Sequence, residues 1–172
     1  MKRKARTTAF LGLCVALAMM FSYVEVLLPP LVAALPGVKI GLPNVVILFV
    51  LYRFGAWQAA TVSFVRVLLM FLLFGNLLSL AYSAAGALLS ILVMVLLKKT
   101  ALFSVVGVSV AGGILHNVGQ ILMAVCLLGV AEIGYYLVVL AITGCVFGAA
   151  VGFLGAVAER RVPRLPFEGG AP

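Results

Sequence analysis

The sequence predicts an all-α integral membrane protein, a bundle of six transmembrane helices with both termini in the cytoplasm. Of the 172 residues, 66% are hydrophobic and only 9% are charged, which leaves too little polar material to cover a soluble domain. Several apolar runs are close to the roughly 20 residues needed to cross a ~30 Å hydrocarbon core. These runs are apolar on all faces, whereas the strands of a membrane barrel alternate polar and apolar residues.

The first predicted span runs from Thr7 to Leu28 and follows a basic stretch at residues 1–6. A cleaved signal peptide also places basic residues before an apolar stretch. This run, however, exceeds the usual ~7–15 residues of such a segment and ends at Pro29-Pro30 instead of a small-x-small cleavage site. We therefore expect the mature protein to keep this span.

The second predicted span, from Asn44 to Tyr52, is short for a full crossing. It either begins within the preceding Pro- and Gly-rich loop, an external segment that carries Lys39, or is buried among its neighbours. A tight turn at residues 53–56 then leads into the third span, from Trp57 to Phe74.

Three more spans complete the expected bundle. Gly75-Asn76 turns the chain into the fourth span, which ends at Leu97; the fifth runs from Phe103 to Leu128 and the sixth from Tyr135 to Val157. The sequence thus predicts one six-helix membrane domain at residues 1–158 and a cytoplasmic polar tail at residues 159–172.

The basic residues give the orientation. With six spans, all of the 12 Lys and Arg residues except Lys39 and Arg66 fall on the side of the termini, and an excess of Lys and Arg marks the cytoplasmic side. The net charge of +8 therefore encodes topology, and we expect the lipid bilayer of the cell membrane, and no nucleic acid, as the surroundings of these charges. Cys14, Cys126 and Cys145 lie in different spans without paired spacing, so we expect no metal site.

Arg66 is the first candidate site residue. It lies midway along the third span, where a charge costs at least ~2.5–3.5 kcal/mol, so its side chain is expected to face the interior of the bundle. It could form an internal ion pair or contact backbone carbonyls. Alternatively, it could bind the carboxylate or phosphate of a ligand, because the guanidinium group matches both.

The fifth and first spans carry the other polar candidates. His116 and Gln120 lie four residues apart on one helical face, with Asn117 adjoining, and they could contact a ligand or hold helices together. Glu25, near the outer end of the first span, could pair with Arg66 or Lys39 or lie at an outward-facing site. No nucleophile has a general base at helical spacing, so we expect no enzyme and no cofactor.

Small residues recur along the cytoplasmic half of the first span at spacings of four, three and four. Such a row lets another helix approach closely, either within this chain or from a partner subunit. These residues are Ala5, Ala9, Gly12 and Ala16.

Several segments together resemble the Gx transporter family, often catalogued as heptaprenyl diphosphate synthase component I. The resemblance covers about residues 5–158 and rests on the segments SYVE, VKIGLPN, SFVRVL, FSVVGVS and HNVGQ, which begin at Ser22, Val38, Ser63, Phe103 and His116. Pro43 stands where Ala is common in that family.

The family resembles the substrate-binding S components of energy-coupling factor (ECF) vitamin transporters. The resemblance implies a six-helix protein with an outward-facing pocket lined or supported by Lys39, Asn44, Arg66, His116, Asn117 and Gln120. It also implies that Ala5, Ala9, Gly12 and Ala16 face a transmembrane coupling subunit driven by two ATPases. The ligand would be an anionic or amphipathic vitamin, quinone, flavin or isoprenoid precursor.

The catalogue description itself points to a different function, in prenyl diphosphate elongation. Prenyl synthases hold magnesium and diphosphate with paired Asp-rich motifs, and this sequence contains no Asp. The alternative to transport is therefore a non-catalytic membrane subunit associated with heptaprenyl diphosphate or quinone biosynthesis.

Overall fold

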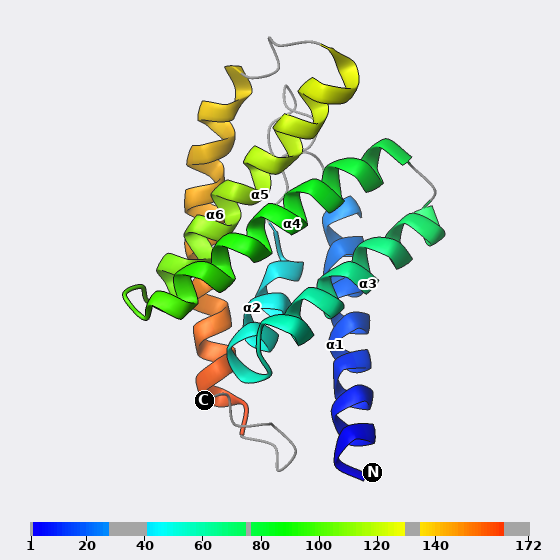
Figure 1. The fold of residues 1–172 in the computed structure, drawn as a ribbon, viewed down its shortest axis with the longest axis vertical. Helices are drawn as coiled ribbons and strands as arrows, with labels where there is room; N and C mark the ends of the chain where they lie inside the picture. Colours follow the sequence, from blue (N-terminus) through cyan, green and yellow to red (C-terminus); the bar gives the residue numbers. More distant parts are fainter. Residues whose placement is uncertain (1, 28–40, 75–76, 130–134, 164–172) are drawn as a thin grey trace.

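The computed structural model describes residues 2–27, 41–74, 77–129 and 135–163, and within these ranges it contains six α-helices and no strand. The helices are α1 (Lys2–Leu27), α2 (Pro43–Arg53), α3 (Ala56–Phe74), α4 (Leu77–Thr100), α5 (Val105–Leu128) and α6 (Tyr136–Arg161). The prediction of an all-helical fold is confirmed. In Figure 1, the start of α1 and the end of α6 lie at the same end of the molecule.

Five of the six helices, all except α2, are long and apolar enough to cross a membrane, which makes this a multi-pass membrane protein. The second predicted span, α2, has only 11 residues. At 1.5 Å per residue it extends about 16 Å, roughly half of the hydrocarbon core. The expected set of six helices is therefore present, but α2 does not have the length of a full span.

α2 forms the centre of the hydrophobic core. This agrees with one of the two predicted alternatives, in which the short second span is buried among its neighbours. Ile47, Leu48, Val50 and Leu51 are each at most 1% exposed, and the helix packs against α1, α3 and α6. A helix that is apolar all round is stable only in such a fully buried place. Pro43 occupies its first turn, where the missing N–H of proline costs nothing.

Glycines allow α5 to pack closely against both α4 and α6. A Cβ atom added at Gly119 of α5 would lie 2.7 Å from the carbonyl oxygen of Ala85 in α4, and one added at Gly148 of α6 would lie 2.8 Å from the Cα of Val110 in α5. These three helices therefore form the tightest part of the bundle, because nothing larger than hydrogen fits at the contacts.

Two of the basic residues that predicted the orientation are built into the packing. Arg53 is 7% exposed, and its Nη2 donates to the carbonyl oxygens of Glu159, at 3.0 Å, and of Val162. The Lys98 ammonium group donates to the carbonyl oxygen of Leu51, at 2.7 Å.

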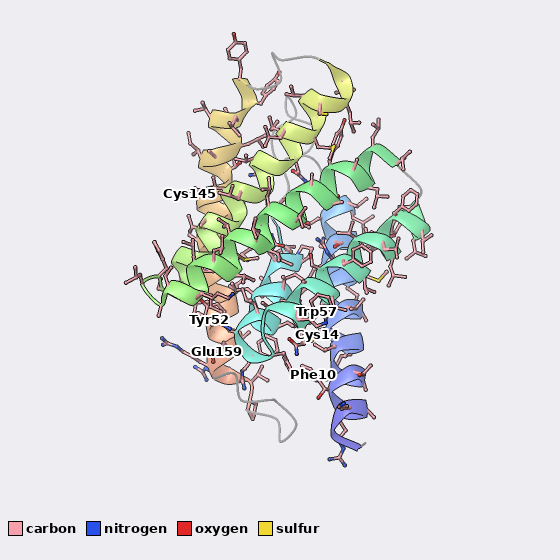
Figure 2. All side chains as sticks on the ribbon, viewed as in Figure 1. Phe10, Cys14, Tyr52, Trp57, Cys145 and Glu159 are labelled. Atoms are coloured by element: carbon pink, nitrogen blue, oxygen red, sulfur yellow. The ribbon has the colours of Figure 1, made fainter. Side chains whose placement is uncertain are left out.

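The contact with Arg53 satisfies backbone carbonyls at the end of α6, which have no partner within the helix. α6 continues to Arg161, so residues 159–161, predicted as the start of the tail, are helical. Figure 2 shows Tyr52 and Glu159 in this part of the molecule, together with Phe10 of α1.

Candidate functional site

α2 is much shorter than the other helices, as Figure 1 shows, and its first turn lies at the end facing away from the two ends of the chain. Here a pocket of about 110 Å³ lies beyond the first turn of α2, between α1, α3, α4 and α5. Its polar lining residues are Ser22, Glu25, Asn44, Arg66, Ser79, Ser83 and His116. Four of the predicted site residues, Glu25, Asn44, Arg66 and His116, thus lie together although they come from four different helices.

Arg66 provides the positive charge of this pocket. Its Nη1 donates to Oγ of Ser22 at 3.1 Å, and the Ser22 hydroxyl in turn donates to the carbonyl oxygen of Ala18 at 2.9 Å. The Nε atom is buried and has no hydrogen-bond partner among the described residues. A guanidinium group carries five N–H donors, and this buried donor beside the cavity still requires an acceptor beyond the described residues.

Glu25 is the one carboxylate in the pocket lining, and it is engaged by the backbone. Its Oε1 accepts hydrogen bonds from the amide of Leu42, at 2.8 Å, and from the amide of Gly41. Leu42 is the N-cap of α2, so the carboxylate lies at the positive end of that helix dipole. Glu25 also attracts Arg66 electrostatically.

The positive end of α2 is therefore already neutralised from within the chain. Asn44 in the first turn of α2 lines the pocket, but an anionic ligand there would find its positive charge at Arg66 and not at the start of α2. Of the two predicted partners of Glu25, the structure supports Arg66; Lys39 lies outside the described residues.

His116 and Gln120 act as a pair, as their spacing predicted. The side-chain nitrogen of Gln120 lies 3.2 Å from Nε2 of His116, a geometry in which the amide donates to a neutral imidazole ring. His116 lines the pocket, whereas Gln120 does not. Gln120 consequently supports the site by orienting the ring of His116.

Asn117 holds helices together. It is 5% exposed, and its amide donates to the carbonyl oxygen of Leu140 in α6 at 2.7 Å. It borders only a small hollow of about 20 Å³, which it shares with Asn44 and His116. Of the two predicted roles, ligand contact or contact between helices, the second is the one that the hydrogen bond supports.

Two serines of α4 belong to the pocket and were not identified from the sequence. Ser79 and Ser83 line it, one helical turn apart. A signal was present, because Ser79, Ser83, Gly86 and Ser90 recur at spacings of four, three and four along an otherwise apolar span. Hydroxyl groups on one face of such a span indicate the face that turns inward.

The row of small residues on α1 points away from the rest of the chain. Ala5, Ala9, Gly12 and Ala16 are all exposed, and a Cβ atom at Gly12 would have nothing within 4 Å. The inward face of the same helix carries the buried residue Cys14, two positions from Ala16 and thus about 200° around the axis. The described residues therefore do not cover this row, and packing within them does not explain it.

The described residues contain no group of three or more His, Cys, Asp or Glu side chains that could hold a metal ion. The three cysteines are free: Cys14 is buried, and Cys126 and Cys145 are exposed. Chemically, the pocket combines one guanidinium group with hydroxyl, amide and imidazole side chains and with one carboxylate, whose Oε1 already accepts from backbone amides. The guanidinium group is the part suited to binding an anion.

Comparison with known proteins adds one finding. A family model described as heptaprenyl diphosphate synthase component I matches residues 14–158, a segment that contains every pocket residue named above. No curated protein and no solved structure matches the chain. The match covers most of the sequence, and the chain belongs to the heptaprenyl diphosphate synthase component I family.

Proposed function

We propose that this chain is the substrate-binding membrane subunit of a small-molecule importer, similar to the S components of ECF transporters. It captures an anionic or amphipathic molecule in the pocket around Arg66 and performs no catalysis itself. The observation that carries the proposal is the buried Nε of Arg66, a donor beside a cavity with no partner among the described residues. Burying this cation at mid-span costs at least ~2.5–3.5 kcal/mol, which Glu25 offsets in part and an anionic ligand offsets further.

The position of the pocket favours uptake from outside the cell. Lys and Arg residues lie in the last turns of α2, α4 and α6. Such clusters of basic residues mark the cytoplasmic side of a membrane protein. The pocket lies beyond the opposite, first turn of α2 and is thus nearer to the outer surface. Both termini are accordingly cytoplasmic in this proposal.

The exposed small residues of α1 supply the second requirement of an importer subunit, a surface for the motor. The sequence contains no Gly-rich phosphate loop ending in Gly-Lys-Ser or Gly-Lys-Thr, so uphill transport by this chain needs partner proteins. Ala5, Ala9, Gly12 and Ala16 offer a flat face to which a helix of a coupling subunit can pack closely. The coupling subunit would in turn carry two ATPases.

A second function is kept because the family description favours it. A membrane subunit that anchors or regulates a prenyl diphosphate or quinone pathway enzyme could use the same pocket to bind a pathway intermediate. It would not catalyse elongation, because the sequence has no Asp with which to build the Asp-rich magnesium motifs.

The two functions are separated by purifying the protein from its native membrane and identifying the small molecules and proteins that accompany it by mass spectrometry. Coupling subunits with ATPases and a bound metabolite support the importer. Co-purification of a prenyl synthase without ATPases contradicts it and supports the second function. Gly12→Leu tests the surface for the coupling subunit in the same experiment, since it obstructs the exposed face of α1 without a clash inside the chain. This variant should lose the coupling subunit and keep the bound metabolite.

Arg66→Ala tests the pocket directly. We expect the variant to assemble in detergent like the wild type and to lose the co-purified ligand. Arg53→Ala is the control, because this buried arginine contacts the end of α6 and lies outside the pocket lining: it should lower stability and keep the ligand. An Arg66→Ala protein that retains its ligand would refute the proposed site.

A further inference from the structure

The polar pocket is too small to hold a whole ligand. Its volume is about 110 Å³, whereas pockets for drug-sized molecules usually measure ~300–1,000 Å³. A carboxylate, phosphate or diphosphate group matches this volume and the charge of Arg66. The bulky ring system of a flavin does not.

A second, larger hollow lies next to it. A groove of about 700 Å³ runs between α3 and α4, and its walls are almost wholly apolar, including Ala60, Phe64, Leu68, Ala84 and Leu88. In Figure 1, α3 and α4 both run obliquely from lower left to upper right. A groove of this size and composition suits a hydrocarbon chain.

The groove and the pocket adjoin each other. Val67 of α3 and Leu80 of α4 line both of them, and Val67 directly follows Arg66 in the sequence. A molecule whose charged group lies beside Arg66 and whose chain lies in the groove has to pass between these two side chains.

The groove is also open toward the surrounding lipid. Phe64 is 69% exposed and Leu88 is 71% exposed, and both belong to its walls. A hydrocarbon chain can remain in contact with the bilayer while the head group enters the bundle sideways, so the ligand does not have to leave the membrane to be captured.

We propose that the ligand is a single-chain amphiphile, with an anionic head bound beside Arg66 and a hydrocarbon chain lying in the groove between α3 and α4. This inference rests on the proposed function, which requires only that the Arg66 pocket binds the ligand. It adds the class of the ligand and the place of its chain. The shared lining residues and the complementary charge favour this occupant over acyl chains of the bilayer or a helix of a partner protein.

The test measures binding to the purified full chain in phosphatidylcholine nanodiscs, with empty nanodiscs subtracted. The probes are radiolabelled farnesyl diphosphate, inorganic diphosphate as the head alone, and farnesol as the chain alone. Three variants accompany the wild type. Arg66→Gln removes the charge, Ala84→Phe fills the groove at an exposed position, and Leu92→Phe adds a ring at an exposed position of α4 outside the groove.

We expect saturable binding of farnesyl diphosphate that is tighter than that of either fragment. Arg66→Gln should weaken it about tenfold or more, as expected for the loss of hydrogen bonds from a charged group. Ala84→Phe should weaken the binding of farnesyl diphosphate about fivefold or more, because the added ring overfills the groove. The same variant should bind inorganic diphosphate with unchanged affinity. Leu92→Phe should bind both like the wild type.

Equal affinities of Ala84→Phe and Leu92→Phe for farnesyl diphosphate would overturn the inference, because they mean that bilayer acyl chains or a partner helix cover the groove. So would the absence of saturable farnesyl diphosphate binding. Neither result contradicts the proposed function as long as Arg66→Ala loses the co-purified ligand. If Arg66→Ala retains that ligand, the proposed function itself is refuted.

A second measurement covers the case in which Ala84→Phe fails to assemble. A farnesyl diphosphate analogue with a photoreactive group at the end of its chain should label groove residues of α3 and α4 in the wild-type protein. Labelling confined to α1 or α6 contradicts the inference.

Discussion

The contact between α4 and α5 at Gly119 allows a quantitative test of the packing. In Gly119→Ala, the new Cβ would lie 2.7 Å from the carbonyl oxygen of Ala85 and 2.9 Å from the Cα of Gly86, and both are backbone atoms that no side-chain rotation can move. Ordinary van der Waals contact begins at 3.4 Å, so the two helices must separate by about 0.7 Å, the difference between 3.4 Å and 2.7 Å. Overpacking of this kind costs roughly 1–3 kcal/mol.

The matched control is Gly12→Ala, at which nothing lies within 4 Å of the new Cβ. Both variants replace glycine by alanine inside a helix, so both gain the same ~0.5–1 kcal/mol of intrinsic helix preference. The difference in free energy of unfolding between the two variants therefore isolates the clash. It can be measured by steric trapping in bicelles, where binding of a bulky protein to tagged sites reports equilibrium unfolding.

We expect Gly119→Ala to be less stable than Gly12→Ala by roughly 1–3 kcal/mol. If the two unfold within about 0.5 kcal/mol of each other, the close packing of α4 on α5 is not as described, because a clash of this kind costs roughly 1 kcal/mol or more.

Three further predictions concern single polar contacts. Asn117→Ala should lower the free energy of unfolding by roughly 0.6–1.7 kcal/mol in the same assay, because the hydrogen bond to Leu140 is lost; an unchanged stability would contradict its role between α5 and α6. Ser104→Ala should cost about 1 kcal/mol and speed hydrogen exchange in the first turn of α5, since its hydroxyl accepts from the amide of Gly107 at 3.2 Å; unaltered exchange there would argue against the cap. Arg53→Gln should cost about 1.5–3 kcal/mol and expose the last turn of α6 to proteolysis, and a variant as resistant as the wild type would show that this contact is dispensable.

Part of the site could be predicted from residues alone. The free-energy cost of a charge in hydrocarbon singled out Arg66, and helical spacing put His116 and Gln120 on one face. The same reasoning left the role of Asn117 open. Spacing defines which face of a helix a residue occupies, but not whether a cavity or a neighbouring helix lies opposite it.

The amino-acid sequence by itself determined that this is a membrane protein, where most of its helices lie, and which polar residues must turn inward. Those conclusions follow from local quantities: hydropathy, length and the position of charges. The tertiary structure alone decided that the short α2 is buried among its neighbours and leaves a pocket above its first turn, that Glu25 neutralises the start of α2, and that α3 and α4 leave a groove between them. In lipid, an inward and an outward face can be equally apolar, so hydropathy carries little information about which helices touch, and only the fit between their surfaces settles it.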